Sequence, residues 1–371
     1  MAAVRELASH CAGWLWPLLI DHLWEATVVS GAVLLLTLVL RRMPARVRYA
    51  LCLLASVKFL LPSVLVFLAA ASLGPAVLHR LPALDLSPLP PLALEPSTVR
   101  ALIAVWLAGS VLLAGLCLRR RARFAGALAA GRRLSSGPEA AALARARERL
   151  GLRRDIELVA SPALTAPGVW RAFRPVLVLP EGIAEHLTPA ELDAVLLHEL
   201  IHVQRWDNLV GNLHLTICCL FWFHPLVWLL DHRLLAEREV ACDDQVVRLC
   251  GQPEVYARGL LKVLRFGLGW RLAGASAAAS SDLKRRLERL AAGSRYVPPS
   301  LLHRGLVGAA AALLLALSVA AGHGATARAG AAYCRLVILP QLSRPHPAMA
   351  PASPSGCPLG RERAERARNL S

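Results

Sequence analysis

Four long apolar runs, separated by polar segments rich in arginine, dominate the pattern of the chain. They cover about residues 16–40, 49–73, 101–118 and 305–321. A helix needs about 20 apolar residues to cross the ~30 Å hydrocarbon core of a bilayer, so each run is predicted to be a transmembrane helix. The alanine-rich fourth run is the weakest. The Arg41-Arg42 pair behind the first run indicates an uncleaved span rather than a secretory signal.

The segment between the third and fourth runs has a different pattern. It begins with a polar stretch of helical character, and two short apolar runs follow at Ile156–Ala160 and Pro175–Pro180, with proline and glycine nearby as is typical of strands. The sequence therefore predicts a mainly α polytopic membrane protein with four transmembrane helices and an inserted α+β domain. The expected organisation is a membrane region with three helices, the inserted domain, the fourth helix and a short, disordered tail: 1–118, 119–304, 305–321 and 322–371.

Composition agrees with a membrane protein and excludes several other classes. Of the 371 residues, 56% are apolar and 18% are charged, which is too apolar for an ordinary soluble enzyme or an intrinsically disordered chain. The net charge of +17 raises nucleic acid as a partner. However, the basic residues gather where the apolar runs end, and the chain has no zinc-finger, RNP or basic-zipper pattern. No direct nucleic-acid binding is therefore expected.

The basic residues also predict the orientation in the membrane, because arginine and lysine close to spans mark the cytoplasmic side. Basic clusters follow the first and third runs and precede the fourth, at 41–48, 119–123 and 284–304. The proline-rich connection 74–97 has few basic residues and is expected outside. The prediction is a multi-pass protein of the cytoplasmic (inner) membrane, with both termini outside and the inserted domain in the cytoplasm.

The inserted domain carries the residues that indicate chemistry. A helix is predicted to begin at Thr188-Pro189, with Glu191 completing a capping box. It contains His198-Glu199-Leu200-Ile201-His202, an H-E-x-x-H motif whose two histidines project from one face. That spacing lets two imidazoles bind one zinc ion, and Glu199 is placed to accept a proton from water activated by the metal.

A third ligand is expected downstream, because catalytic zinc usually has three protein ligands and one open position. In the helical pattern that follows, Glu239 and Asp243 fall on one face at i, i+4. Glu239 is predicted to complete a site for one Zn²⁺ per chain, and Asp243 to hold a ligating histidine through its distal ring nitrogen. Cys242, about 100° away on the same helix, is expected to be a small core residue.

One further apolar stretch, Leu209–Leu230, is long enough to be read as another span. A straight helix of that length would separate its own two ends by about 33 Å, so His202 and Glu239 would lie on opposite sides of the membrane and could not bind one ion. The polar residues within the stretch and the His224-Pro225 pair also make it a poor span. We therefore predict a helical hairpin broken at Pro225, either buried in the domain or dipping into the membrane surface.

The segments LPEGIAEHLTPAELDAVLLHELIHVQRWDNLVGNL, FWFHPLVWLL and EREVACDD together resemble the membrane-embedded gluzincin metallopeptidases of the β-lactam sensor-transducer (Bla/Mec regulator) family. The resemblance covers about residues 41–290 and implies a cytoplasmic, zincin-like peptidase domain that signals by proteolysis. Position by position, it implies His198, His202 and Glu239 as metal ligands and Glu199 as the catalytic base. Residues 322–371 are too few for the extracellular penicillin-binding domain of the antibiotic sensors, so a member lacking that domain is expected.

The predicted function is zinc-dependent hydrolysis of peptide bonds in a cytoplasmic or membrane-proximal protein. The resemblance implies a transcriptional repressor, or the peptidase itself, as the substrate in signal-dependent regulation of transcription. Two alternatives stay open: a constitutive quality-control protease of the membrane, and a non-catalytic signalling scaffold, against which the intact Glu199 argues. The lipid bilayer is the other expected partner, and the sequence leaves a homodimer open.

Several further residues have roles that the sequence leaves undecided. His214 and His224 are either packed structural histidines or stabilisers of an oxyanion near the zinc. Cys334 and Cys357, in the predicted outer tail, are candidates for a disulfide. No C-x-x-C pair is present, so a second, cysteine-based zinc site is not expected. The predicted strand 176–179 is expected to pair with the substrate backbone by edge addition.

Overall fold

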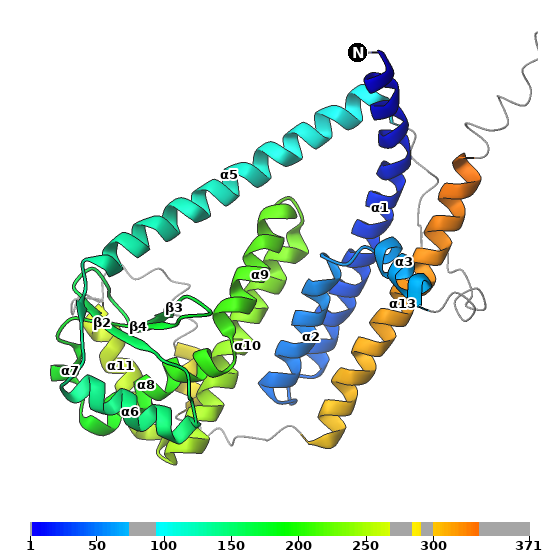
Figure 1. Cartoon of the computed structure of the whole chain (residues 1–371). Coiled ribbons are helices and arrows are strands. Elements are labelled where there is room, and N and C mark those ends of the chain that lie inside the picture. Colours follow the sequence, from blue (N-terminus) through cyan, green and yellow to red (C-terminus); the bar gives the residue numbers. More distant parts are fainter. Residues whose placement is uncertain (1, 74–93, 268–283, 291–299, 334–371) are drawn as a thin grey trace, which may run out of the picture. The chain divides into compact units, whose positions relative to one another are not determined.

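The computed structural model describes residues 2–73, 94–267, 284–290 and 300–333 (Figure 1). Within them the chain is mostly helical, with one small sheet. The chain divides into two compact units, Met1–Ala325 and Thr326–Ser371, and the sheet and all the predicted site residues belong to the first. The proline-rich connection lies largely outside the described residues, and the candidate disulfide of Cys334 and Cys357 lies entirely outside them.

Three helices of the described residues are long and apolar enough to cross a membrane. They are α1 (Ala2–Val39), α5 (Pro96–Ala129) and α13 (Leu301–Tyr333), with candidate spans at 18–39, 97–129 and 301–326. Each overlaps a run predicted from the sequence. The predicted boundaries are too narrow, because α5 continues through the arginine cluster and α13 extends into the expected disordered tail. Arginine and alanine are strong helix formers, so neither change of composition ends a helix.

The second apolar run does not form one uninterrupted helix, contrary to the prediction for residues 49–73. It divides into α2 (Ala45–Lys58) and α3 (Ser63–Leu73), which meet at a bend of 87°. Pro62 explains the break, because proline lacks an amide hydrogen and disfavours the helical conformation in the residue before it. At the bend, Lys58 Nζ donates to Glu25 Oε2 of α1 (2.8 Å), so the buried charge is paired. The bent pair taken together is still apolar enough to be a fourth span.

The inserted domain is built on a four-stranded sheet with the order β1-β2-β4-β3. Its strands are β1 (Arg132–Arg133), β2 (Glu157–Ser161), β3 (Gly168–Trp170) and β4 (Val176–Pro180). The two predicted strands are β2 and β4, which pair in parallel, whereas the short β1 and β3 pair antiparallel at the two edges. Because β4 has a neighbour on both sides, it cannot add a substrate strand. The expectation of edge addition at residues 176–179 is therefore wrong.

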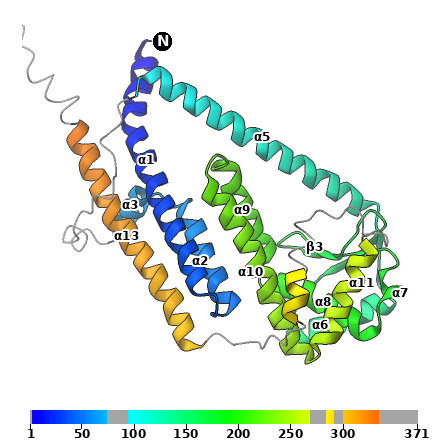
Figure 2. The same cartoon turned by 180° about the vertical axis from the view of Figure 1, so that it is seen from behind.

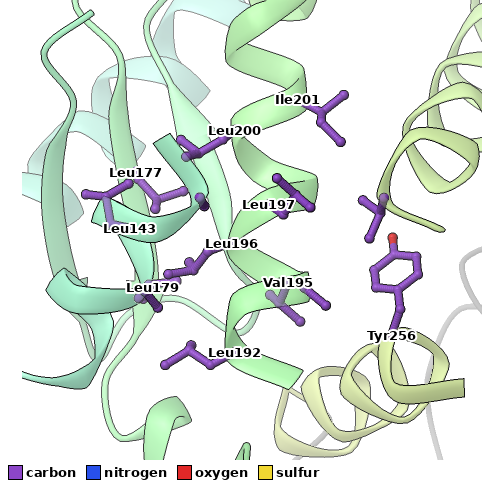
Figure 3. Close-up of a cluster of buried hydrophobic side chains, with 14 of the residues drawn as sticks. Leu143, Leu177, Leu179, Leu192, Val195, Leu196, Leu197, Leu200, Ile201 and Tyr256 are labelled. Atoms are coloured by element: carbon purple, nitrogen blue, oxygen red, sulfur yellow. The ribbon is translucent and has the colours of Figure 1, made fainter. Parts of the chain in front are cut away.

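Helix α8 (Pro189–Gln204) runs through the core of this domain, as Figure 3 shows. On one side Leu196 and Leu200 point toward Leu177 of the sheet and toward α6 (Pro138–Leu150). On the other side Val195 faces Tyr256 of α11 (Pro253–Gly267). A single helical turn, α7 (Ile183–His186), connects β4 to α8. A helix that is apolar on nearly every side is fixed by packing all round, so α8 is a rigid support for its few polar residues.

The chain then forms the predicted helical hairpin. Helices α9 (Asp207–Leu220) and α10 (Pro225–Cys250) run back alongside each other in both views, separated by residues 221–224 (Figures 1 and 2). The break falls where predicted, with Pro225 in the first turn of the second helix, a position that tolerates its missing amide hydrogen. The return of the chain brings α10 back against α8.

Candidate metal centre

The first two predicted ligands stand on a helix whose start is fixed by its own sequence. Thr188 Oγ1 accepts a hydrogen bond from the Glu191 amide (3.3 Å), and the Thr188 amide donates to the Glu191 carboxylate (2.9 Å). This is the predicted capping box, and it defines where α8 begins. His198 and His202 follow one turn apart on the same face of the helix.

The structure brings the three predicted ligands together. The Nε2 atoms of His198 and His202 are 3.2 Å apart, and they lie 3.4 Å and 3.7 Å from the two carboxylate oxygens of Glu239 on α10. Donor atoms held tetrahedrally at about 2.0–2.1 Å from one zinc ion are themselves separated by about 3.3–3.4 Å. The three side chains therefore fit a zinc-sized ion with little movement.

The hydrogen bonds of the two rings support the same conclusion. His202 Nδ1 lies 2.7 Å from Asp207 Oδ2. An ionised carboxylate can only accept a hydrogen bond, so the ring donates from Nδ1 and its Nε2 carries a lone pair. The Tyr256 hydroxyl donates to Asp243 Oδ1 (2.6 Å) and therefore accepts from His198 Nδ1 (2.8 Å). Two lone pairs then face each other and the Glu239 carboxylate. A cation between the three donors satisfies this arrangement.

Two of the orienting residues were not singled out in the sequence. Asp207 reaches back to His202 because Trp206 adopts a left-handed φ of 60° and turns the chain sharply between α8 and α9. That conformation costs about 1–2 kcal/mol for a residue with a side chain, and the Arg154 guanidinium, 3.9 Å from the indole ring centroid, helps to hold it. Tyr256 is fully buried on α11, 58 residues from His198, and no local spacing points to it.

Asp243 lies beside His198 as predicted, but the two side chains are linked by hydrogen bonds through the Tyr256 hydroxyl and not by a direct one. Its Oδ1 is 3.5 Å from His198 Nδ1, whereas the bridging tyrosine hydroxyl is within hydrogen-bond distance of both. Arg286 donates to the two oxygens of Asp243 (2.9 Å and 2.7 Å) and also lies 3.3 Å from Glu239 Oε2. The orientation of His198 thus depends on a buried chain of groups that Arg286 anchors.

Burial and charge separate the two glutamates of the site. Burial raises the pKa of Glu199, and the neighbouring His202 ring offsets this only in part. Burial also opposes ionisation of Glu239, but the adjacent His198 and His202 rings and the Arg286 guanidinium hold its pKa well below the usual range. Glu239 is therefore kept as a carboxylate, the form that binds metal, while Glu199 takes up a proton more readily than an ordinary glutamate.

A cavity of about 480 Å³ opens over the three donor atoms and Glu199. Its wall includes Gly168 and Val169 of β3 and two apolar residues of α11, Leu260 and Val263. Strand β3 pairs with β4 on one side and has no second strand partner among the described residues. The edge strand beside the donor atoms is therefore β3 and not β4.

The two further histidines lie in the α9–α10 hairpin and do not line this cavity. His224 Nε2 is 2.9 Å from Thr27 Oγ1 of α1, and His214 Nε2 is 3.4 Å from Asp231 Oδ1. Their position favours a structural role over stabilisation of an oxyanion. Cys242 is fully buried, with its Sγ 3.5 Å from His202 Nδ1, as expected for a core residue.

Comparison with known proteins identifies the family of the chain. The model of the family described as BlaR1 peptidase M56 matches residues 19–290, a range that includes every residue of the site. The chain belongs to this family. The predicted resemblance to membrane sensor-transducer peptidases is therefore confirmed, and membership implies a metallopeptidase fold associated with the membrane.

Individual relatives match a smaller part. The chain is similar to the regulatory protein BlaR1 of Bacillus licheniformis, with 32% identity over 102 residues, and to the methicillin resistance mecR1 protein of Staphylococcus aureus, with 26% identity over 112 residues. These alignments cover 28% and 30% of this chain, but only 17% and 19% of the two relatives. The chain thus spans less than a fifth of the length of the curated relatives that it matches.

Proposed function

We propose that this member of the BlaR1 peptidase family is a zinc-dependent endopeptidase of the membrane. The observation that carries the proposal is the close approach of His198 Nε2, His202 Nε2 and the Glu239 carboxylate, at 3.2 to 3.7 Å, beside Glu199 in one cavity. Imidazole and carboxylate donors suit Zn²⁺. Three protein ligands leave one position open, which is the pattern of catalytic rather than structural zinc sites.

The residues of the chain have separable roles in the proposed reaction. Zinc, when bound, supplies a Lewis acid that polarises the scissile carbonyl and lowers the pKa of the attacking water. Glu199 is not a ligand, so its carboxylate is available to accept the proton of that water and to deliver it to the leaving amine. The pKa of Glu199, raised by burial, suits this double role. Asp207 and Tyr256 hold the imidazoles in the tautomer that leaves Nε2 free.

The substrate is expected to bind in an extended conformation along β3. An exposed strand edge offers backbone groups to a peptide, and Gly168 and Val169 place that edge at the wall of the cavity. Asn208 of α9 donates to the Val169 carbonyl (2.9 Å) and so ties β3 to the helix that follows the H-E-x-x-H motif. The apolar residues of α11 that line the same cavity favour apolar side chains next to the cleaved bond.

The relatives support a regulatory substrate. One is named a regulatory protein and another a methicillin resistance protein. We infer that the peptidase cleaves a cytoplasmic or membrane-proximal protein, either a transcriptional repressor or itself, in response to a signal.

A co-expression experiment tests this substrate. A candidate repressor, tagged at both ends, is expected to be shortened when the wild-type peptidase is present and to stay intact without it; a repressor gene next to the gene of this chain is the first choice. If the repressor and the peptidase both stay whole while unrelated membrane proteins are degraded, a constitutive quality-control protease is the correct function.

We also propose a membrane topology with the peptidase domain in the cytoplasm. The candidate span of α5 is covered by apolar side chains that are more than two-fifths exposed, as a lipid-facing helix requires: Leu102, Val105, Val111, Leu112 and Leu118. The apolar tip of the α9–α10 hairpin is exposed as well, at Phe223 and Trp228, which suits contact with the membrane surface. The arginine clusters beside the spans mark the cytoplasmic side of the membrane and so support this orientation.

Reporter fusions test the topology. A reporter that is active only outside the cytoplasm is expected to be active when fused after Pro91 and silent when fused after Gly137, because the candidate span of α5 lies between these positions. A cytoplasmic reporter at the same two positions should give the opposite pattern. Extracytoplasmic activity at Gly137 would place the peptidase domain outside the cell.

A further inference from the structure

A second cluster of metal-ligating side chains lies in the α9–α10 hairpin. His214 and Cys218 are four residues apart on α9, so they share one face of the helix, and Asp231 approaches them from α10. One ligand atom from each residue lies within 4.8 Å of the other two. None of the three lines the cavity of the proposed active site.

His214 is the member of this cluster whose surroundings are unusual. The residue is only 3% exposed, yet neither ring nitrogen makes a well-aligned hydrogen bond, and its one backbone contact is with Val227. The ring faces the Val227 backbone and the Asp231 carboxylate, with Nε2 3.4 Å from Oδ1. Buried polar groups nearly always have a partner, and a histidine that only paired with an aspartate would approach to about 2.7–2.9 Å. The longer gap matches the separation of two donors that share one ion, about 3.3–3.8 Å.

We propose that His214, Cys218 and Asp231 bind a second divalent transition-metal ion, of the zinc class, in addition to the ion of the active site. Nitrogen, sulfur and oxygen donors of these types bind Zn²⁺ at about 2.0–2.3 Å, whereas Ca²⁺ and Mg²⁺ require more oxygen ligands than the cluster offers. A thiolate and a carboxylate together neutralise a divalent cation. The bound site is therefore uncharged, as its apolar neighbours Ile217 and Leu230 require.

The position of the cluster gives the ion a structural role. It lies between α9, whose first residue Asp207 orients His202, and α10, which carries Glu239 two helical turns after Asp231. A metal ion at this point cross-links the two helices that connect the ligands of the active site. Asp231 is 37% exposed, so the site has an entry path and room for a water molecule as a fourth ligand.

The chain has no C-x-x-C pair, the usual signal of a cysteine-based zinc site. The relevant signal is the i, i+4 spacing of His214 and Cys218, the same helical spacing that makes His198 and His202 neighbours. This spacing was hidden inside an apolar stretch, Leu209–Leu230, whose hydropathy suggested a membrane span.

Cobalt substitution of the purified full-length chain in detergent tests the proposal. The ligands of the active site are nitrogen and oxygen atoms, so a thiolate-to-cobalt charge-transfer band reports the second site alone. After removal of unbound metal, the wild type is expected to hold about two Co²⁺ per chain and to show this band. Cys218→Ser is expected to hold about one and to lose the band. Cys219→Ser is the matched control, because its thiol interacts with Cys117 of α5 instead, and it should keep both ions.

Three further variants separate the two sites. His202→Ala should lose one equivalent of cobalt and keep the band, and Cys242→Ser, whose sulfur lies next to His202, should also keep it. Asp231→Asn changes a partly exposed side chain, and the variant protein is expected to hold one ion. This variant tests the second site if Cys218→Ser fails to fold. One cobalt per wild-type chain without the band, or a band that survives Cys218→Ser, would overturn the proposal and leave the active-site assignment untouched.

Discussion

The substitution Glu199→Gln is expected to abolish nearly all proteolysis while the active-site metal stays in place. Glutamine keeps the shape and most of the hydrogen bonding of glutamate, but it cannot accept a proton as a carboxylate does. Loss of a general base typically lowers the rate by roughly 10²–10⁴-fold. Metal content of the purified variant, and cleavage of the co-expressed repressor and of the peptidase itself, are the measurements.

The control for this substitution is Glu185→Gln, which makes the same chemical change at an exposed position of α7 in the same domain. It should retain full activity and metal. Cleavage by Glu199→Gln at the wild-type rate would show that Glu199 is not the base. If the wild type also cleaves nothing in a broad screen of proteins and peptides, the chain is a signalling scaffold.

The substitution His202→Ala is expected to remove the active-site metal altogether, and proteolysis with it. Two remaining ligands rarely hold zinc against a competing chelator. Glu239→Gln should also release metal, because it replaces a charged oxygen ligand with a neutral amide. Both variants should therefore contain one equivalent of metal less than Glu199→Gln after dialysis against a mild chelator, as measured by elemental analysis.

An exposed histidine of the same domain provides the comparison. His186→Ala on α7 lies outside the cavity and should leave the metal content unchanged. Full metal occupancy in His202→Ala would contradict the ligand assignment, whereas loss of metal in Glu199→Gln would make Glu199 a ligand rather than the base.

Much of the site could be predicted because its signals are local. Thr188 and Glu191 identify a helix start within four residues, and the two histidines share a face because of the helical period. Even the hairpin followed from a distance argument, since a straight helix would have kept His202 and Glu239 apart. Each of these inferences needs only local helix geometry and the chemical requirement that three ligand atoms surround one metal ion.

The residues that escaped prediction depend on tertiary packing. Tyr256 reaches His198 from a different helix, and Arg286 reaches Asp243 across 43 residues of sequence. Strand β3 has three residues, too few for an alternating pattern to stand out, so the interior strand β4 was mistaken for the edge. The bend at Pro62 is a different case, because a proline inside an apolar run is visible in the sequence and hydropathy alone ignores it.

Because α9 and α10 run antiparallel, the length of the hairpin does not determine the distance between the metal ligands at its base. His202 and Glu239 lie at the base of this hairpin, and residues 221–224 form its tip. A turn of helix added to each arm would move the tip outward by about 5.4 Å and leave the base where it is. The reach of the hairpin can therefore be matched to a thicker bilayer or a more distant partner while the spacing of the ligands is conserved.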